Sequence, residues 1–388
     1  MKKDLLIIHG GGPTAVLNAS LYGALQEAGQ YAEIGRIWGA RNGTGGVLRE
    51  EFIDLGRVSR GSRELLLTTP GSAIGTSRDE LTPQDYERMA AILERRGIGY
   101  VLFGGGNGTM DTCGKLCRAC RALGLGIRLM GIPKTHDNDL MGTDHSPGYG
   151  SAARYFAASV KELCADVRGL PIHVVILEAS GRNAGWTAAA SSLAWDEDGL
   201  GPDLIYLPER PFEEARFLAD VQRLRQKKSG IVVVASEGLR NAEGNPIVRP
   251  IFTSGRATYF GDVSSHLANL VVERLGCKAR NEKPGLLGRA SAAMQSEVDR
   301  REAVLMGREA CRALMRGESG KMAALRRVST DPYICEPFLV DIDASMLSEK
   351  TMPDEFINAE GNGVTPAFAA WCRPLIGGKL PSMLTLNG

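Results

Sequence analysis

The sequence predicts an α/β fold with two Rossmann-like three-layer domains and mostly parallel sheets. The chain has 388 residues, more than one hydrophobic core usually organises, so two domains are expected. Short apolar runs alternate with amphipathic helical segments along most of its length, which is typical of parallel sheets covered by helices. Glycine-rich turns follow apolar runs, where ligands of parallel sheets bind. We expect an active site in the cleft between the two domains.

The alternation begins at the N-terminus. Residues 5–28, LLIIHGGGPTAVLNASLYGALQEA, read as a strand, a glycine turn and a helix, and residues 100–123, YVLFGGGNGTMDTCGKLCRACRAL, repeat that design. Further strands are expected at Ile127–Ile132, Ile172–Leu177, Asp203–Leu207 and Ile231–Ala235. Further helices are expected at Tyr149–Leu163, Glu213–Lys227 and Val298–Leu314.

Changes of pattern near Tyr149 and near residues 289–297 suggest domain boundaries. We expect one domain to span residues 1–149 plus about 293–345, and the other to span 150–292 plus about 346–388. The tail from Asp331 onward carries aromatic residues and prolines, so it is expected to be folded.

Composition excludes several classes of partner. Lysine and arginine number 46 against 45 acidic residues, which gives no electrostatic case for nucleic acid or an anionic membrane. No apolar run approaches the roughly 18–20 residues that cross a bilayer. The N-terminal run LLII enters glycines with no cleavage-site pattern, so it reads as a buried strand. The eight cysteines have no disulfide-like spacing, and a cytoplasmic location is expected.

Both glycine turns are candidate anion sites. Gly11 and Gly12 let the backbone approach a ligand closely, and the following helix offers unpaired N–H groups. The second turn, residues 104–112, adds Thr109, whose hydroxyl could bond a phosphate oxygen. Arg78 lies among small, turn-forming residues and is a candidate phosphate clamp. The alternatives are a tight turn without a ligand and a solvated loop arginine.

The segment at residues 130–148, MGIPKTHDNDLMGTDHSPG, concentrates charge in a glycine- and proline-punctuated stretch. Phosphoryl transfer to a hydroxyl needs a carboxylate that takes the proton and a cation that stabilises the migrating charge. Asp137 and Asp139 supply carboxylates, and on an extended strand end their spacing would point both the same way. Lys134 adds the positive charge.

Several motifs occur in one order along the chain: GGGNGTMDT, PKTHDND, EASGRNAGW, LIYLPERPF and VVVASEGL. Together they resemble the phosphofructokinase family of ATP- or pyrophosphate-dependent enzymes. Within the family, the chain most resembles the compact pyrophosphate-type branch. Four segments carry this resemblance: GGPTAVLNASLYGAL, DLMGTDHSPGYGSAARY, GRNAGWTAAAS and PDEFINAEGNGVTPAF. The resemblance implies transfer of a phosphoryl group to the 1-hydroxyl of fructose 6-phosphate, a step of glycolysis, with Mg²⁺ as cofactor.

The resemblance also implies residue roles. The first domain would bind the donor and the second the sugar phosphate. Asp137 would take the proton, with Lys134, Thr135 and Asp139 beside it. The donor would contact Gly11, Gly12, Arg78, Gly106, Asn107, Gly108 and Thr109, and Asn107 would hold the metal. The acceptor would contact Thr135, Asp137, Asp139, Ser180, Gly181, Arg182, Glu237, Arg280 and Arg289. In the family one of the last two arginines comes from a neighbouring subunit, which implies a homodimer or homotetramer.

Departures from the family pattern affect both substrates. Glycine at Gly108 is typical of ATP users because a missing side chain leaves room for the α-phosphate, whereas Lys134 is typical of pyrophosphate users. We favour ATP, with a pyrophosphate-dependent enzyme as the alternative. Asn107 stands where many members have aspartate. His136, Ser180 and Gly288 replace isoleucine, methionine and glutamine, so a related sugar phosphate is a further alternative.

Two more distant functions compete with this interpretation. Relatives of NAD kinases or lipid kinases also use a GGDG-like turn, but the THDND and SGRNAG segments argue against them. A ligand sensor that has lost its catalytic activity would explain Asn107 and His136. The carboxylates and arginines of the family pattern are intact, which argues against such a loss.

Overall fold

The computed structural model describes residues 2–170, 173–196, 198–254, 257–346 and 349–386. The chain divides into two compact units, each built from two stretches of sequence. The first unit comprises Met1–Ser151 and Ala290–Lys350, and the second comprises Ala152–Arg289 and Thr351–Gly388.

The first unit is built on a seven-stranded sheet in the order β13-β12-β5-β4-β1-β2-β3. Its strands are β1 (Lys3–His9), β2 (Ile34–Ala40), β3 (Phe52–Asp54), β4 (Ile98–Gly105), β5 (Arg128–Pro133), β12 (Lys321–Thr330) and β13 (Tyr333–Asp341). All neighbours pair in parallel except the two edge strands, β3 and β13, which run antiparallel. The central strands are apolar and almost fully buried, as expected where helices cover both faces.

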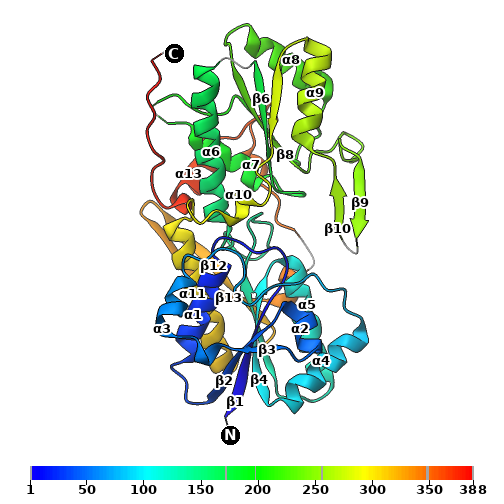
Figure 1. The fold of residues 1–388 in the computed structure, drawn as a ribbon, viewed down its shortest axis with the longest axis vertical. Coiled ribbons are helices and arrows are strands. Elements are labelled where there is room, and N and C mark those ends of the chain that lie inside the picture. Colours follow the sequence, from blue (N-terminus) through cyan, green and yellow to red (C-terminus); the bar gives the residue numbers. More distant parts are fainter. Residues whose placement is uncertain (1, 171–172, 197, 255–256, 347–348, 387–388) are drawn as a thin grey trace. The chain divides into compact units, whose positions relative to one another are not determined.

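Helices cover both faces of this sheet (Figure 1). One side carries α1 (Leu17–Ala28), α3 (Arg60–Leu65) and α11 (Glu297–Met315), and the other carries α2 (Gly43–Leu48), α4 (Pro83–Arg95) and α5 (Asn107–Ala122). A short 3₁₀ turn, η1 (Leu55–Arg57), and α12 (Ile342–Ser345) complete the unit. Each face has its own apolar core, one around Phe103 and Met110 and the other around Leu21 and Met306.

The second unit has a smaller parallel sheet in the order β11-β6-β8-β7. Its strands are β6 (Val174–Ala179), β7 (Leu204–Tyr206), β8 (Ile231–Ser236) and β11 (Ala279–Glu282), with a separate hairpin of β9 (Pro250–Ser254) and β10 (Ala257–Phe260). Figure 1 shows α6 (Tyr149–Gly169) on one side of the sheet and α8 (Glu214–Arg225) and α9 (Val263–Leu275) on the other. The remaining helices are α7 (Trp186–Ala190), η2 (Ser191–Ala194), α10 (Leu287–Ala290), η3 (Asp354–Phe356), α13 (Pro366–Cys372) and η4 (Arg373–Ile376).

The predicted α/β class with mostly parallel sheets is confirmed. The expected strands and helices are present with small shifts at their ends, although Ile172 lies outside the described residues. The C-terminal tail is folded as predicted, since Phe356, Phe368 and Trp371 pack around Trp186. The antiparallel β12–β13 hairpin, which extends the first sheet by two strands, was not predicted.

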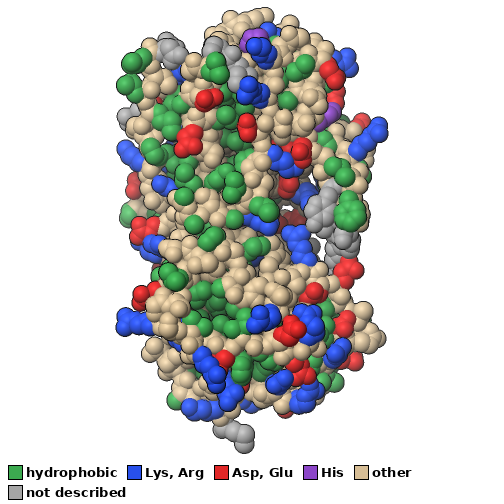
Figure 2. All heavy atoms as spheres, in the orientation of Figure 1, with side chains coloured by type: hydrophobic (Ala, Val, Ile, Leu, Met, Phe, Trp, Pro, Cys, Tyr) green, Lys and Arg blue, Asp and Glu red, His purple; other side chains and the backbone are tan. Residues whose placement is uncertain are grey.

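The described surface matches the balanced composition. On the face drawn in Figure 2, basic and acidic side chains are interspersed over each unit. Within the described chain, the helices are all too short or too polar to cross a bilayer.

Two glycines bring α1 and α11 unusually close. A Cβ added at Gly23 would lie 2.1 Å from the Val304 carbonyl oxygen, and one added at Gly307 would lie 2.0 Å from the Ser20 carbonyl oxygen. Both neighbours are backbone atoms of the partner helix, so a side chain at either glycine forces the helices apart.

Gly307→Ala is therefore expected to lower the free energy of unfolding by about 1–3 kcal/mol through overpacking. Gly169→Ala is the matched control, because a Cβ at Gly169 in α6 meets no atom within 4 Å. That control should be neutral or slightly stabilising, since alanine favours helix more than glycine does. Chemical denaturation of both variants tests this, and equal stabilities would contradict the close packing.

Candidate active site

The first unit brings three turns to one edge of its sheet. β4 pairs in parallel with both β1 and β5, with His9 opposite Gly104 and Gly105 opposite Pro133. The chain segments that follow these strands therefore start side by side. The Gly10 amide donates to the Gly104 carbonyl at 3.0 Å, and the Lys134 amide donates to the Gly105 carbonyl at 3.0 Å. The two glycine turns and the charged loop predicted from the sequence thus lie together.

Thr109 fills the space between the two glycine turns. A Cβ built at Gly10 would lie 2.4 Å from Thr109 Oγ1, and one built at Gly105 would lie 2.1 Å from it. Glycine is therefore needed at both positions to seat a buried threonine, in addition to letting a ligand approach. Gly11 has φ +74°, a conformation that side chains rarely adopt.

The second turn leads directly into α5. Gly106 is the residue before the helix, and Asn107, Gly108 and Thr109 form its first turn. The unpaired N–H groups of a helix start favour an anion. Nothing lies within 4 Å of a Cβ built at Gly108, so the space beside it is open.

Arg78 follows a short parallel bridge between Gly10 and Ser77. The Gly11 amide donates to the Ser77 carbonyl at 2.9 Å, which fixes the start of this segment beside the first glycine turn. Asp79 accepts bonds from the Thr44 and Ser77 hydroxyls at 2.6 Å each. The Arg78 side chain itself is exposed next to the turn, as a phosphate clamp would require.

Lys134 is buried, with 4% of its surface exposed, and its ammonium group donates to the Gly12 carbonyl. A Cβ built at Gly11 would lie 3.7 Å from Lys134 Nζ, so the charge lies at the first glycine turn. Burial, together with this positive charge, lowers the pKa of His9 to about 3. The lysine therefore supplies the fixed cation on this side of the site.

The loop after β5 carries the carboxylates but is not extended. The strand ends at Pro133, and Asn138 has φ +55°, which is left-handed. The expectation that Asp137 and Asp139 lie on an extended strand end is therefore wrong. They nevertheless interact, because burial first and the Asp137 charge second raise the pKa of Asp139. Thr135 Oγ1 accepts the Asp137 amide at 3.1 Å and fixes the turn.

The backbone carbonyl of Asp139 is held by two distant segments. It accepts the Lys350 amide at 2.8 Å and Asn107 Nδ2 at 3.2 Å. Asn107 thereby connects the start of α5 to the carboxylate loop. Its other side-chain atom, Oδ1, is buried and has no hydrogen-bond partner among the described residues. An oxygen left in this way suits a hard cation or its bound water.

His136 lies next to the candidate base. Its Nε2 is 3.2 Å from Asp137 Oδ1, and its side chain is 13% exposed. The residue that replaces isoleucine in the family pattern therefore contacts Asp137 directly.

Six of the nine predicted acceptor residues lie in the second unit. Ser180, Gly181 and Arg182 follow β6, and Glu237 follows its neighbour β8. The Gly181 amide donates to Glu237 Oε1 at 3.3 Å. Gly181 has φ +116°, as its turn requires. The structure thus brings these four residues together at one sheet edge.

Two of the three candidate arginines of the second unit are exposed. Arg182 is exposed, with its guanidinium 5.9 Å from the Phe260 ring centre. Arg280 is exposed in β11, the strand next to β6, and Arg289 lies in α10. Gly288 is buried, and a Cβ there would lie 2.8 Å from the Phe156 ring. A glutamine at that position would require Phe156 to move.

Sequence reasoning missed several residues around the carboxylate loop. Lys350 donates through Nζ to the carbonyls of Thr143 at 3.1 Å and Asp144 at 2.6 Å. His145 lies between Asp144 and Glu302. A signal was available only for His145, which lies within the charged segment; Lys350 and Glu302 are far away in the sequence.

Comparison with known proteins agrees with these features. The sequence model of the family described as Phosphofructokinase matches residues 4–314. The pyrophosphate–fructose 6-phosphate 1-phosphotransferase of Xanthomonas campestris pv. campestris is 37% identical, over 97% of this chain and 92% of that protein. The sulfofructose kinase of Alkalicoccus urumqiensis is 34% identical, over 97% of this chain and 95% of that protein.

A solved structure gives the same result. The pyrophosphate-dependent phosphofructokinase from Nitrosospira multiformis superposes with a TM-score of 0.90 at 34% identity, covering 98% of this chain and 94% of that chain. The ordered motifs, the glycine turns beside a carboxylate loop and these near-full-length similarities lead to one conclusion: the chain belongs to the phosphofructokinase family.

Proposed function

We propose that this protein transfers a phosphoryl group to the 1-hydroxyl of fructose 6-phosphate, giving fructose 1,6-bisphosphate. The observation that carries the proposal is the parallel pairing that puts both glycine turns and the Lys134–Asp139 segment at one sheet edge. Phosphoryl transfer needs these components together: amide donors, a cation and a carboxylate. The names of full-length relatives, which act on fructose 6-phosphate with pyrophosphate, support it.

In the proposed reaction Asp137 accepts the proton of the acceptor hydroxyl as the phosphoryl group arrives. Burial and the neighbouring Asp137 charge raise the pKa of Asp139, and the place of Asp137 in the PKTHDND motif makes Asp137 the proposed base. Lys134 and the amides at the start of α5 stabilise the charge on the transferring group. Arg78 binds the donor phosphates from the adjoining segment.

Magnesium fits this chain through the unsatisfied Asn107 Oδ1, which would hold the ion or one of its waters. The ion, when bound, would neutralise charge on the donor phosphates. Asparagine contributes no charge of its own, so the donor phosphates would supply the negative charge in this site.

On the acceptor side, Arg182, Arg280 and Arg289 are proposed to bind the 6-phosphate. Guanidinium groups bind phosphate through paired hydrogen bonds, and the Arg182 and Arg280 side chains are exposed. Ser180, Gly181 and Glu237 would bind the sugar. The family resemblance implies that a neighbouring subunit donates one arginine, so a homodimer or homotetramer is proposed.

ATP is proposed as the donor because of the open space beside Gly108. Initial rates with fructose 6-phosphate and Mg²⁺ should then be higher with ATP than with pyrophosphate. Gly108→Asp should lower the rate with ATP by about 100-fold, because a carboxylate would face the α-phosphate. Gly126→Asp is the matched control, since a Cβ at Gly126 also meets no atom within 4 Å and lies outside the turn.

A higher rate with pyrophosphate would overturn this choice of donor. No turnover of fructose 6-phosphate with either donor would count against the proposed acceptor. Sulfofructose is then the acceptor to try, because Ser180 and the Gly288–Phe156 contact differ from the family pattern and one relative is named a sulfofructose kinase.

Asp137→Asn should lower kcat by roughly 10²–10⁴-fold while the acceptor still binds, because the amide cannot accept the proton. Steady-state kinetics and calorimetric titration of fructose 6-phosphate measure the two effects separately. Asp343→Asn, which alters an exposed aspartate paired with Arg118, is the control and should leave kcat unchanged. Retention of kcat by Asp137→Asn would rule out Asp137 as the base.

Asn107→Asp should lower kcat by about tenfold, although aspartate is common at this position in the family. A carboxylate cannot donate to the Asp139 carbonyl and would repel it, so the carboxylate loop would shift. Kinetics at saturating Mg²⁺ test this. An increase in kcat would show that metal binding limits the rate and that the hydrogen bond to Asp139 does not matter.

A further inference from the structure

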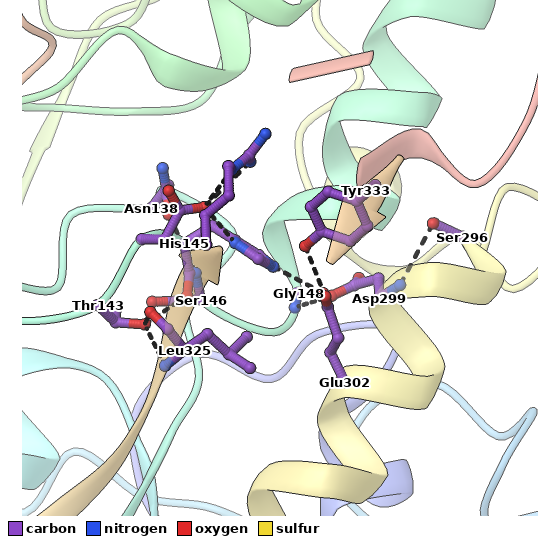
Figure 3. Close-up of polar contacts among 12 residues, drawn as sticks. Asn138, Thr143, His145, Ser146, Gly148, Ser296, Asp299, Glu302, Leu325 and Tyr333 are labelled. Atoms are coloured by element: carbon purple, nitrogen blue, oxygen red, sulfur yellow. Dashed lines mark hydrogen bonds and ion pairs between the residues drawn. The ribbon is translucent and has the colours of Figure 1, made fainter. Parts of the chain in front are cut away.

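We define the catalytic loop as residues 134–148. His145, near the end of this loop, lies between two carboxylates, those of Asp144 and Glu302. It is 1% exposed, with Nδ1 2.8 Å from Asp144 Oδ2 and Nε2 2.6 Å from Glu302 Oε2. Figure 3 shows the imidazole pointing from the loop toward Glu302 on α11. A neutral imidazole has a single N–H group, so one of these two contacts would place two acceptors face to face. The two contacts therefore need one proton more than a neutral imidazole between two carboxylates carries, and an imidazolium that donates to both carboxylates supplies it.

Among the described residues, further polar groups around His145 come from α11, β12, β13 and the end of the first unit. Glu302 also accepts the Tyr333 hydroxyl at 2.6 Å, and Asp144 also pairs with Arg327 at 3.0 Å. Asp299, Cys335 and Lys350 are the further titratable groups of the described chain that interact with this cluster. Buried charges require such partners, and a member removed alone leaves an unpaired charge.

Helix α11 also holds the far end of the catalytic loop. Asp299, one turn before Glu302, accepts the Gly148 amide at 2.8 Å, the Ser151 amide at 2.9 Å and the Ser151 hydroxyl at 2.5 Å. Figure 3 shows Asp299 and Glu302 side by side on the helix, both turned toward the loop. The helix thus contacts the C-terminal part of the loop at two points, His145 and Gly148.

Interactions within the loop link His145 and Gly148 to the Asp137 and Asp139 carboxylates. The ends of the loop meet in a bridge between Thr135 and Gly148. Across its middle, Asn138 Oδ1 accepts the Ser146 amide at 3.0 Å. Asn138 separates Asp137 from Asp139, so a movement of residues 144–146 is passed to both carboxylates.

We propose that the Glu302–His145 ion pair is a clasp that positions the Asp137 and Asp139 carboxylates for phosphoryl transfer. Glu302 and His145 are positioning residues, since neither is placed to contact the reacting atoms. The inference rests on the proposed function, because it concerns the rate of that reaction.

The electrostatics of His145 agree with a permanent charge. Burial lowers its pKa, but Glu302 and Asp144 outweigh burial and raise the pKa to about 9. Because this folded-state value exceeds the ordinary 6.5, the charge stabilises the protein fully below pH 6.5. That contribution is lost as pH rises through about 9.

Glu302→Gln tests the clasp, because the amide keeps the size and the acceptor for Tyr333 but removes the charge. The pKa of His145 must then fall, so the variant loses the imidazolium at a pH where the wild type keeps it. The ratio of variant kcat to wild-type kcat should fall roughly tenfold between pH 6 and pH 8.5, with KM unchanged. His145→Gln, which lacks the charge at every pH, should show a lowered kcat with a flat ratio.

Glu309→Gln is the matched control on the same helix. Glu309 is 8% exposed against 7% for Glu302, and it pairs with Arg312 and Arg316, away from the loop. This variant should lose stability but keep a flat kcat ratio. A sloping ratio for Glu309→Gln, or a flat one for Glu302→Gln, would overturn the clasp.

Two measurements need no turnover. NMR titration of His145 in the wild-type protein should show a charged imidazole at pH 7.5, and a neutral one would overturn the clasp even if Glu302→Gln does not fold. Hydrogen exchange of the loop amides should quicken in Glu302→Gln between pH 6 and pH 8.5, beyond the intrinsic pH effect seen in Glu309→Gln. An inactive wild type with intact NMR and exchange results would count against the proposed function alone.

Discussion

The pairing of β4 with both β1 and β5 is the constraint on which the donor side of the site depends. It sets His9 opposite Gly104 and Gly105 opposite Pro133, so three chain segments leave the sheet at one level. Parallel strands share one carboxyl edge, and only small residues let the departing turns lie this close. The close approach of the turns is seen at Thr109, whose side chain lies against both Gly10 and Gly105. A side chain at either glycine would displace the start of α5.

The sequence was sufficient for the strand–turn–helix units and for the residues that directly follow strands. Strand ends are readable because an apolar run stops at glycine or at a charged residue, as at Gly10 and Lys134. The direction of side chains within the following loop was not readable. The left-handed Asn138 turns the chain between Asp137 and Asp139, and a local spacing rule for strands cannot anticipate that.

Contacts between residues far apart in the chain could not be predicted from the sequence either. Glu302 follows His145 by 157 positions, and Lys350 reaches the Asp139 carbonyl from the end of the first unit. On a helix such as α11, a buried glutamate looks like any other charged residue until its partner is known. The hydrophobic periodicity that locates the helix carries no information about that partner. Asn107 illustrates the same limit: its identity suggested a weaker metal ligand, whereas its amide also bonds the carboxylate loop.

The catalytic loop tolerates three aspartates because each has a different electrostatic environment. Asp144 is paired with His145 and Arg327, which hold the pKa of its carboxyl well below the usual range despite burial. Its charge is therefore neutralised within the clasp and adds little to the repulsion between the other two. Burial and the charge of Asp137 raise the pKa of Asp139. A third unpaired carboxylate would add to the repulsion within this pair, so the arrangement of the loop depends on Asp144 being held elsewhere.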